Sequence, residues 1–328
     1  MAQVATSDAR STQLLQNHSF PSKIELEGAA KRLGQLTPTN MKASIIQNTE
    51  IMDIRAKVHD GITLYKLNLP KNTKGLRQYL AGYPHISECH CTSGLNRTQG
   101  EDNGREKLET TISGFAAKTL KPQGIRPYLI SVGSGSLAQE LQVCQSLADA
   151  GVTDFKLVLA DPLYKDSSCM KPGCKQEMVH EFLTLLHVGL GLNITAGLGD
   201  SKSCTTVNNA INSFKKSALY QEDKTKKGSA EISFFPTSDA YLRDVKPNQQ
   251  RPNIVFDSDF KSDINERNQI MNGPLKASDT TALYISLGKY SRFHDTQSTH
   301  VDLETKTRIN GRWNESNVVP IAAGSCKH

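Results

Sequence analysis

The chain of 328 residues is poor in aromatic residues and lacks a long apolar run. Aromatic side chains make up 6% of it, with a single tryptophan, and hydrophobic residues reach 37%. The most apolar stretch, 182–199, contains His187 and Asn193, so no transmembrane helix is expected there. These deficits exclude membrane-spanning, collagen-like and coiled-coil proteins. They indicate a water-soluble globular chain with polar loops, and no membrane partner is expected.

A strong excess of charge of either sign is also missing. The sequence has 39 Lys and Arg against 33 Asp and Glu, a formal net charge of +6, and its clearest basic clusters fall within 215–227. A nucleic-acid-binding protein usually gathers its basic side chains on one face, where they displace counterions from phosphates. The charge therefore permits a nucleic-acid partner without implying one.

The sequence has no basic and apolar leader, and its seven cysteines follow no disulfide spacing. Residues 1–19 are rich in Gln, Ser, Thr and Asn, which predicts a disordered tail. Reduced thiols and the missing leader favour a cytoplasmic location. Composition does not distinguish this from export by a leaderless route.

Beyond residue 121, apolar runs of strand length alternate with amphipathic stretches of helical length. The run 128–132 ends in a Gly-Ser-Gly-Ser turn, a helical pattern follows to Gly151, and a second run, 155–160, ends at Asp161. Strand, turn, helix and strand in this order predict a βαβ unit with parallel strands. The pattern also predicts further strands at 231–235, 253–256 and 281–286, and helices at 108–120, 176–190 and 205–220.

Asn310-Gly311 between two short strand-like runs predicts a closing hairpin. The fold class we predict is therefore α/β, with a doubly wound, mostly parallel sheet closed by an antiparallel hairpin. This domain should span 121–328. Residues 20–120 should form an N-terminal mixed α/β extension that caps the mouth of the sheet.

Ligands of a doubly wound sheet bind outside the carboxyl ends of its strands. Four groups of residues fall there: the turn Gly133-Ser134-Gly135, Asp161 after the second run, Asp239-Ala240 after the third, and Asp257 after the fourth. Glycines let the backbone approach a ligand closely, and an acid at a strand end can accept hydrogen bonds from ribose hydroxyls.

Over about residues 126–290 the chain resembles the class I, Rossmann-like S-adenosylmethionine-dependent methyltransferases. The segment 130–136 resembles that family's glycine motif, Asp161 its ribose-binding acid, 234–240 its adenine-binding motif, and 253–257 its fourth strand. The resemblance implies S-adenosylmethionine as cofactor and a methyl acceptor that is a small molecule or a protein. The cofactor-binding residues it implies are Ser131, Gly133, Ser134, Gly135, Asp161, Asp239 and Ala240. Asp257 is then the candidate general base for an acceptor that must lose a proton.

The glycine motif is degenerate. Ser131 stands where the family has an acid, and Leu137 stands at its third glycine. Gly133 and Asp161 are 28 positions apart, against roughly 20 in a compact dinucleotide-binding unit, and about 70 residues separate Asp161 from the next strand-like run. Two alternatives therefore stay open: a non-catalytic, Rossmann-like interaction protein, and an NAD-binding enzyme with Ala138 at the third glycine of its motif.

Three other constellations compete with this interpretation. Asp161-Pro162-Leu163-Tyr164 is similar to the Asp-Pro-Pro-Tyr motif of adenine amino-methyltransferases, but it follows the glycine turn too closely for that role. His85, Cys89, His90 and Cys91 are too cramped to converge on one zinc ion, so no metal is predicted. A cysteine hydrolase lacks a local signature around any thiol.

Overall fold

The computed structural model describes residues 55–59, 62–66, 104–135, 137–216, 220, 228–245, 250–258, 281–289, 301–314 and 317–321. A separate antiparallel hairpin consists of β1 (Arg55–His59) and β2 (Ile62–Lys66). The predicted tail 1–19 and most of the predicted extension 20–120 lie outside these residues. None of the described helices is long and apolar enough to cross a membrane.

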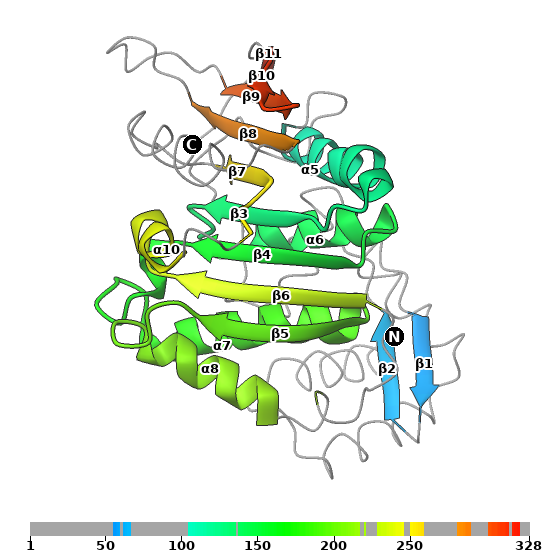
Figure 1. Cartoon of the computed structure of the whole chain (residues 1–328). Coiled ribbons are helices and arrows are strands. Elements are labelled where there is room, and N and C mark those ends of the chain that lie inside the picture. The colour runs from blue at the N-terminus through cyan, green and yellow to red at the C-terminus, as the bar shows by residue number, and fades with distance from the viewer. Residues whose placement is uncertain are drawn as a thin grey trace, which may run out of the picture.

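The main sheet has nine strands in the order β10-β9-β8-β7-β3-β4-β6-β5, with β11 also paired to β9 (Figure 1). From β5 to β8 the neighbours are parallel, and β9 is antiparallel to β8, β10 and β11. The predicted α/β class and the mostly parallel sheet with an antiparallel end are thus confirmed. The strands are β3 (Tyr128–Val132), β4 (Asp154–Ala160), β5 (Leu192–Leu198), β6 (Gly228–Phe235), β7 (Ile254–Ser258), β8 (Ala282–Lys289), β9 (Val301–Ile309), β10 (Arg312–Trp313) and β11 (Asn317–Ile321).

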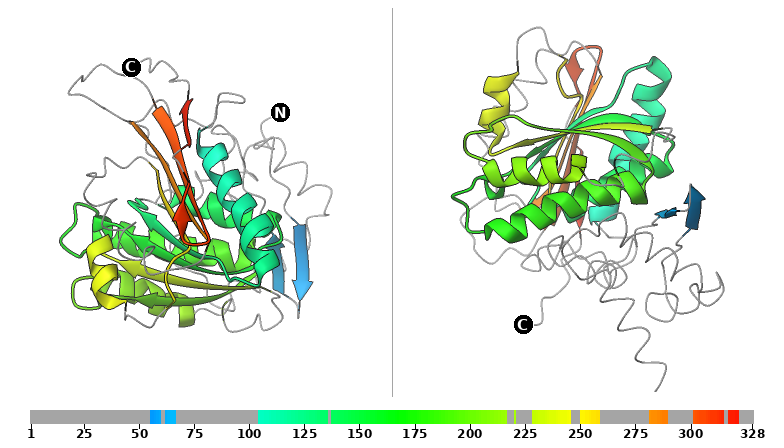
Figure 2. Two further views of the ribbon diagram at one scale, coloured as in Figure 1. Left: turned by 45° about the horizontal axis from the view of Figure 1, so that its top comes forward. Right: turned by 90° about the horizontal axis from the view of Figure 1, so that it is seen from below.

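More helices pack on one face of the main sheet than on the other. Four longer helices share one large apolar cluster with one face of the sheet, and α10 packs on the other face (Figure 2). The helical segments are α5 (Gly104–Phe115), η3 (Ala116–Leu120), η4 (Lys121–Gln123), α6 (Ala138–Asp149), η5 (Pro162–Tyr164), α7 (Pro172–Thr184), η6 (Leu185–Gly189), α8 (Thr205–Lys216) and α10 (Ser238–Asp244). Leu108 and Ile112 of α5 are fully buried in the large cluster, so α5 belongs to the core of the sheet.

The long interval after β4 contains an inserted unit of α7, η6, β5 and α8. Strand β5 forms the edge of the sheet, and the chain then returns to place β6 between β5 and β4. Helix α8 lies on the same face of the sheet as α7, but the chain here runs in the opposite direction across the sheet, from β5 back to β6. The β5–α8–β6 crossover therefore has the opposite hand to the β4–α7–β5 crossover (Figure 2). The insertion explains the interval of about 70 residues that the sequence showed.

The closing hairpin confirms the prediction from Asn310-Gly311. Both residues have positive φ, 52° and 77°, and Ile309 pairs with Arg312. Two consecutive positive φ values define the type I′ turn, whose twist matches that of the flanking strands.

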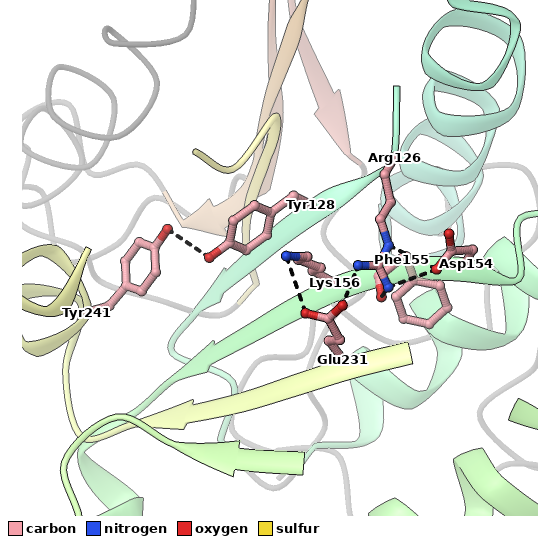
Figure 3. A network of polar contacts seen from close by, with 7 residues as sticks. All are labelled: Arg126, Tyr128, Asp154, Phe155, Lys156, Glu231 and Tyr241. Atoms are coloured by element: carbon pink, nitrogen blue, oxygen red, sulfur yellow. Dashed lines mark hydrogen bonds and ion pairs between the residues drawn. The ribbon is translucent and has the colours of Figure 1, made fainter. Parts of the chain in front are cut away.

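A polar network lies at the amino ends of β3 and β4 (Figure 3). Arg126 forms ion pairs with Asp154, at 2.8 Å, and with Glu231, which also lies 3.3 Å from the Lys156 ammonium. The Tyr241 hydroxyl donates to the Tyr128 hydroxyl at 3.2 Å, which ties α10 to β3. The glycine turn follows the carboxyl end of β3, so this network and the turn lie at opposite ends of the strands.

Candidate active site

The strand register brings the predicted site loops to one edge of the sheet. Val132 at the end of β3 pairs with Ala160 of β4 and with Asp257 of β7, and Ala160 pairs with Phe235 of β6. The chain moves from β3 to β4 on one side and later returns to β7 on the other side. The end of β3 is therefore the topological switch point, where open α/β sheets bind their ligands.

In the turn after β3, which we call the glycine loop, the described residues Gly133, Ser134, Gly135 and Leu137 have an unusual backbone. Gly133, Gly135 and Leu137 have φ values of 73°, 51° and 71°. The loop starts with a hydrogen bond from the Gly133 amide to the Ala160 carbonyl (2.8 Å), and the Leu137 amide donates to the Ser134 carbonyl (3.0 Å). Leu137 thus has a left-handed conformation that usually favours glycine, although its side chain is fully buried.

Asp161 joins this loop to the end of β4. One carboxylate oxygen accepts from the Gly135 amide and the other from the Leu163 amide, both at 2.7 Å. Its side chain is buried, and desolvation raises the pKa of the carboxyl against the opposing effect of these two hydrogen bonds. Asp161 therefore lies at the carboxyl end of β4, where it holds the glycine loop in shape.

The two serines of the motif face buried partners. Ser134 shares a hydrogen bond with the hydroxyl of Tyr164, which is fully buried. Ser131 donates a hydrogen bond of 2.6 Å to Oε1 of Glu140, in the first turn of α6. Desolvation raises the pKa of the Glu140 carboxyl to about 8, despite the Ser131 hydrogen bond and the positive charge of Arg105.

Glu140 is the site residue that the sequence reasoning missed. Its carboxyl comes from the helix that follows the glycine loop and meets the Ser131 side chain. The helical pattern over α6 could have indicated this contact. Side chains of a helix tilt toward its N-terminus, so Glu140 in the first turn points back toward the glycine loop. Spacing along the chain could not show this contact.

The predicted residues after β6 open helix α10. Thr237 caps this helix, and its hydroxyl accepts from the Ala240 amide at 3.1 Å. Asp239 is exposed in the first turn. The structure places Asp239 and Ala240, the two predicted residues, at the same edge of the sheet as the glycine loop.

Asp257 lies inside β7 and is buried. Its carboxylate accepts from the Ser286 hydroxyl at 2.6 Å and from the Tyr284 hydroxyl at 3.2 Å. Ser286 is its partner in the register of β7 and β8. These two hydrogen bonds hold the carboxylate in place.

The competing constellations receive no support from the described residues. His85, Cys89, His90 and Cys91 lie outside them, and no group of three metal-binding side chains occurs within the described segments. Burial raises the thiol pKa of Cys144 and of Cys204, which keeps both protonated and weakly nucleophilic at neutral pH.

The fold and site define an α/β protein with an acid-lined glycine loop at its topological switch point. No protein-family model and no curated protein matches the chain. Among solved structures it is similar to lavandulyl diphosphate synthase from Lavandula x intermedia in complex with dimethylallyl diphosphate, with a TM-score of 0.27 and 11% identity, covering 43% of this chain and 80% of that one. A TM-score this low indicates neither a shared fold nor a shared function.

Proposed function

We propose that the protein is an S-adenosylmethionine-dependent methyltransferase whose cofactor binds at the glycine loop. One observation carries the proposal: two buried carboxyl groups, of Asp161 and Glu140, lie at a glycine loop on the switch point of the sheet. A loop lined by acids suits a ligand that brings positive charge and hydroxyl donors. S-adenosylmethionine has a sulfonium, an ammonium and two ribose hydroxyls.

The same charges argue against a dinucleotide. A pyrophosphate needs free backbone amides and a positive field at the glycine turn. In this chain Asp161 already accepts from the Gly135 amide, and its buried carboxyl would repel a phosphate. An NAD-binding enzyme is therefore the weaker proposal.

In the proposed reaction the cofactor supplies a methyl group that is already activated by the sulfonium. The tasks of the protein are to orient the acceptor in line with the methyl group and to keep water out. Asp161 would accept from the ribose hydroxyls with the lone pairs that the Gly135 and Leu163 amides leave. Asp257, held by Ser286 and Tyr284, would accept the proton of an acceptor that must be deprotonated.

A specific observation also favours the second candidate, a non-catalytic interaction protein. The side chains of Asp161 and Ser134 both bind groups of the protein itself, as expected of a loop with a purely structural role. Cofactor binding distinguishes the two functions.

Calorimetric titration of the full chain with S-adenosylmethionine and S-adenosylhomocysteine, with NAD as a control ligand, tests the proposal. We expect micromolar binding of the two sulfur ligands and none of NAD. Asp161→Ala should abolish this binding. Asp154→Ala is the matched control, because Asp154 lies at the other end of β4 and should leave binding unchanged. Absence of binding to the unmodified chain would reject the methyltransferase and favour the interaction protein.

A further inference from the structure

The two edges of the main sheet are built differently. At one edge, β10 has only two residues and β11 contains Pro320, which has no amide N–H to donate. At the other edge, β5 has seven residues without proline or a charged side chain (Figure 1). Among the residues that the structure describes, β5 pairs with β6 alone. Short strands, proline and charge protect an edge from further pairing, and β5 has none of these.

The hydrogen bonds of β5 leave one set of backbone groups directed away from the sheet. The Gly199 amide donates to the Phe234 carbonyl of β6 at 3.0 Å. Alternate residues of a parallel strand direct their N–H and C=O groups to the same neighbour, so Thr195 bonds to β6 as well. Ile194 and Ala196 then direct both groups to the open side. These are the donors and acceptors that a further strand would use.

The side chains of β5 suit a second copy of the same strand. Ile194 and Ala196 are buried in the large apolar cluster, and the exposed Asn193 and Thr195 lie on the other face of the sheet. None of these side chains is charged, so two copies of the strand can approach without like-charge repulsion. The charged residue beside them in the register is Glu231, opposite Thr195, and its two ion pairs compensate its charge.

We propose that β5 pairs antiparallel with β5 of a second copy of the chain, so that the sheet continues through a two-fold dimer. The axis passes through Thr195, the middle residue of the strand, because this register alone pairs all seven residues. Ile194 then exchanges two hydrogen bonds with Ala196 of the second copy, and Thr195 faces its own copy as a non-hydrogen-bonded pair. Asn193 faces Gly197 of the second copy, which has no side chain to obstruct it. This dimer goes beyond the proposed function and does not depend on it.

The size of this contact sets the expected affinity. Two paired strands of seven residues bury less than the roughly 1,200 Å² at the lower end of standard interfaces. We therefore expect a reversible dimer with a Kd in the micromolar range. Sedimentation equilibrium of the full chain, from low micromolar to near-millimolar concentration, measures this Kd. A monomer at every concentration in that range would overturn the proposal.

Thr195→Cys tests the position of the two-fold axis. The Cα atoms of a non-hydrogen-bonded antiparallel pair are about 4.5 Å apart, a separation that a disulfide can span. Mild oxidation should therefore link Thr195→Cys into a covalent dimer. Asn193→Cys is the matched control on the same face of the strand, because its two copies would be more than about 10 Å apart. The parent chain gives the background from native thiols, and equal cross-linking of the two variants would overturn the proposal.

Thr195→Lys tests the pairing by charge. It brings two ammonium groups together across the axis and should weaken dimerisation at least about tenfold. Asn317→Lys is the matched control, because it adds the same charge at an exposed position of β11 on the opposite edge and should leave the Kd unchanged. A dimer that resists Thr195→Lys, or one that Asn317→Lys weakens, would overturn the proposal. Circular dichroism checks that each variant is folded, and the cross-linking test decides the matter if Thr195→Lys is not.

Discussion

At the residue scale, Leu137 is a non-glycine residue with a left-handed backbone in the glycine loop. Its backbone is left-handed at φ 71°, and its side chain is fully buried in the core beside α6. The left-handed conformation costs a residue with a Cβ roughly 1 kcal/mol or more. Burial of the leucine side chain outweighs this cost.

We predict that Leu137→Gly is more stable than Leu137→Ala, the reverse of the usual order in helices and strands. Both variants lose the buried side chain, which costs about 2–5 kcal/mol. The glycine variant alone relieves the backbone, so it should be about 1 kcal/mol more stable. Guanidinium unfolding of the two variants measures the difference. Greater stability of the alanine variant would contradict the backbone argument.

A second prediction concerns the pH dependence of stability at Glu140. Its pKa rises from 4.5 to about 8 on folding, so between these values the folded state holds a proton that the unfolded state has lost. Stability therefore falls as pH rises through this window, by up to about 1.4 kcal/mol per pH unit for this group. Glu140→Gln should flatten the profile and gain stability relative to the parent between pH 5 and pH 8.

Unfolding free energies at pH 5, 6, 7 and 8 test this second prediction. Glu181 contributes a slope of the same sign in both proteins, so the comparison isolates Glu140. Parallel profiles for parent and variant would show that the carboxyl is ionised in the folded state.

At this scale the sequence was sufficient to locate Gly133, Gly135 and Asp161, because turn glycines and a strand-end acid are signals of local chemistry. It did not reveal that the Ser131 hydroxyl meets Glu140, nine positions away along the chain. The Asp257 carboxylate was predicted at a strand end and lies within β7 instead, where β8 supplies its partners. Such contacts depend on helix rotation and strand register, which local patterns do not determine.

At the element scale, the loop after β4 connects the glycine loop to the inserted unit. Its Asp161 and Tyr164 bind the glycine loop, and its Asp166 binds the start of α8. The Asp166 carboxylate accepts from the amides of Thr205 and Thr206 at 2.7 and 3.0 Å. Helix α8 therefore receives its N-terminal cap from a residue nearly forty positions earlier in the chain.

We predict that Asp166→Ala destabilises the protein by about 1 kcal/mol at neutral pH, the usual cost of a lost cap. Although desolvation opposes it, hydrogen bonding from Thr206 and Thr205 lowers the pKa of Asp166 to about 2. The cap therefore contributes above the ordinary pKa of 3.8 and is lost as pH falls toward 2, so the difference should be smaller at pH 3 than at pH 7.

Hydrogen exchange of the Thr205 and Thr206 amides checks the cap directly. Both should exchange faster in Asp166→Ala than in the parent chain, while Asp166→Asn, which keeps one acceptor, should be intermediate. Unchanged exchange would mean that another group caps α8.

Most elements of the sheet domain followed from periodicity, because each has its own apolar pattern and turn signals. One exception is β5, which lies within the apolar stretch 182–199 directly after a helical segment. A short apolar run of this kind is ambiguous between strand and buried helix. Its place at the edge of the sheet depends on pairing with β6, about 36 residues further along, which no local pattern could indicate.

At the scale of the whole molecule, the inserted unit also meets the site edge of the sheet at Gly199. Gly199 follows β5, and its amide donates to the Phe234 carbonyl at 3.0 Å. A Cβ at Gly199 would lie 1.8 Å from the ring of Phe235, the last residue of β6. The carbonyl of Phe235 in turn accepts from the Asp161 amide at 3.1 Å. Position 199 therefore connects the insertion to the acid of the proposed site.

Gly199→Ala should destabilise the fold by about 1–3 kcal/mol, because the ring of Phe235 must leave its packing against Tyr241. Gly197→Ala, two residues earlier in β5, is the matched control, since a Cβ there would meet no atom within 4 Å, and its stability should stay within about 0.5 kcal/mol of the parent. If the insertion supports the site, Gly199→Ala should also weaken S-adenosylhomocysteine binding where the folded protein persists, and Gly197→Ala should not. Equal affinities in both variants would show that the sheet edge tolerates displacement of Phe235, and that the insertion stabilises the fold without shaping the glycine loop.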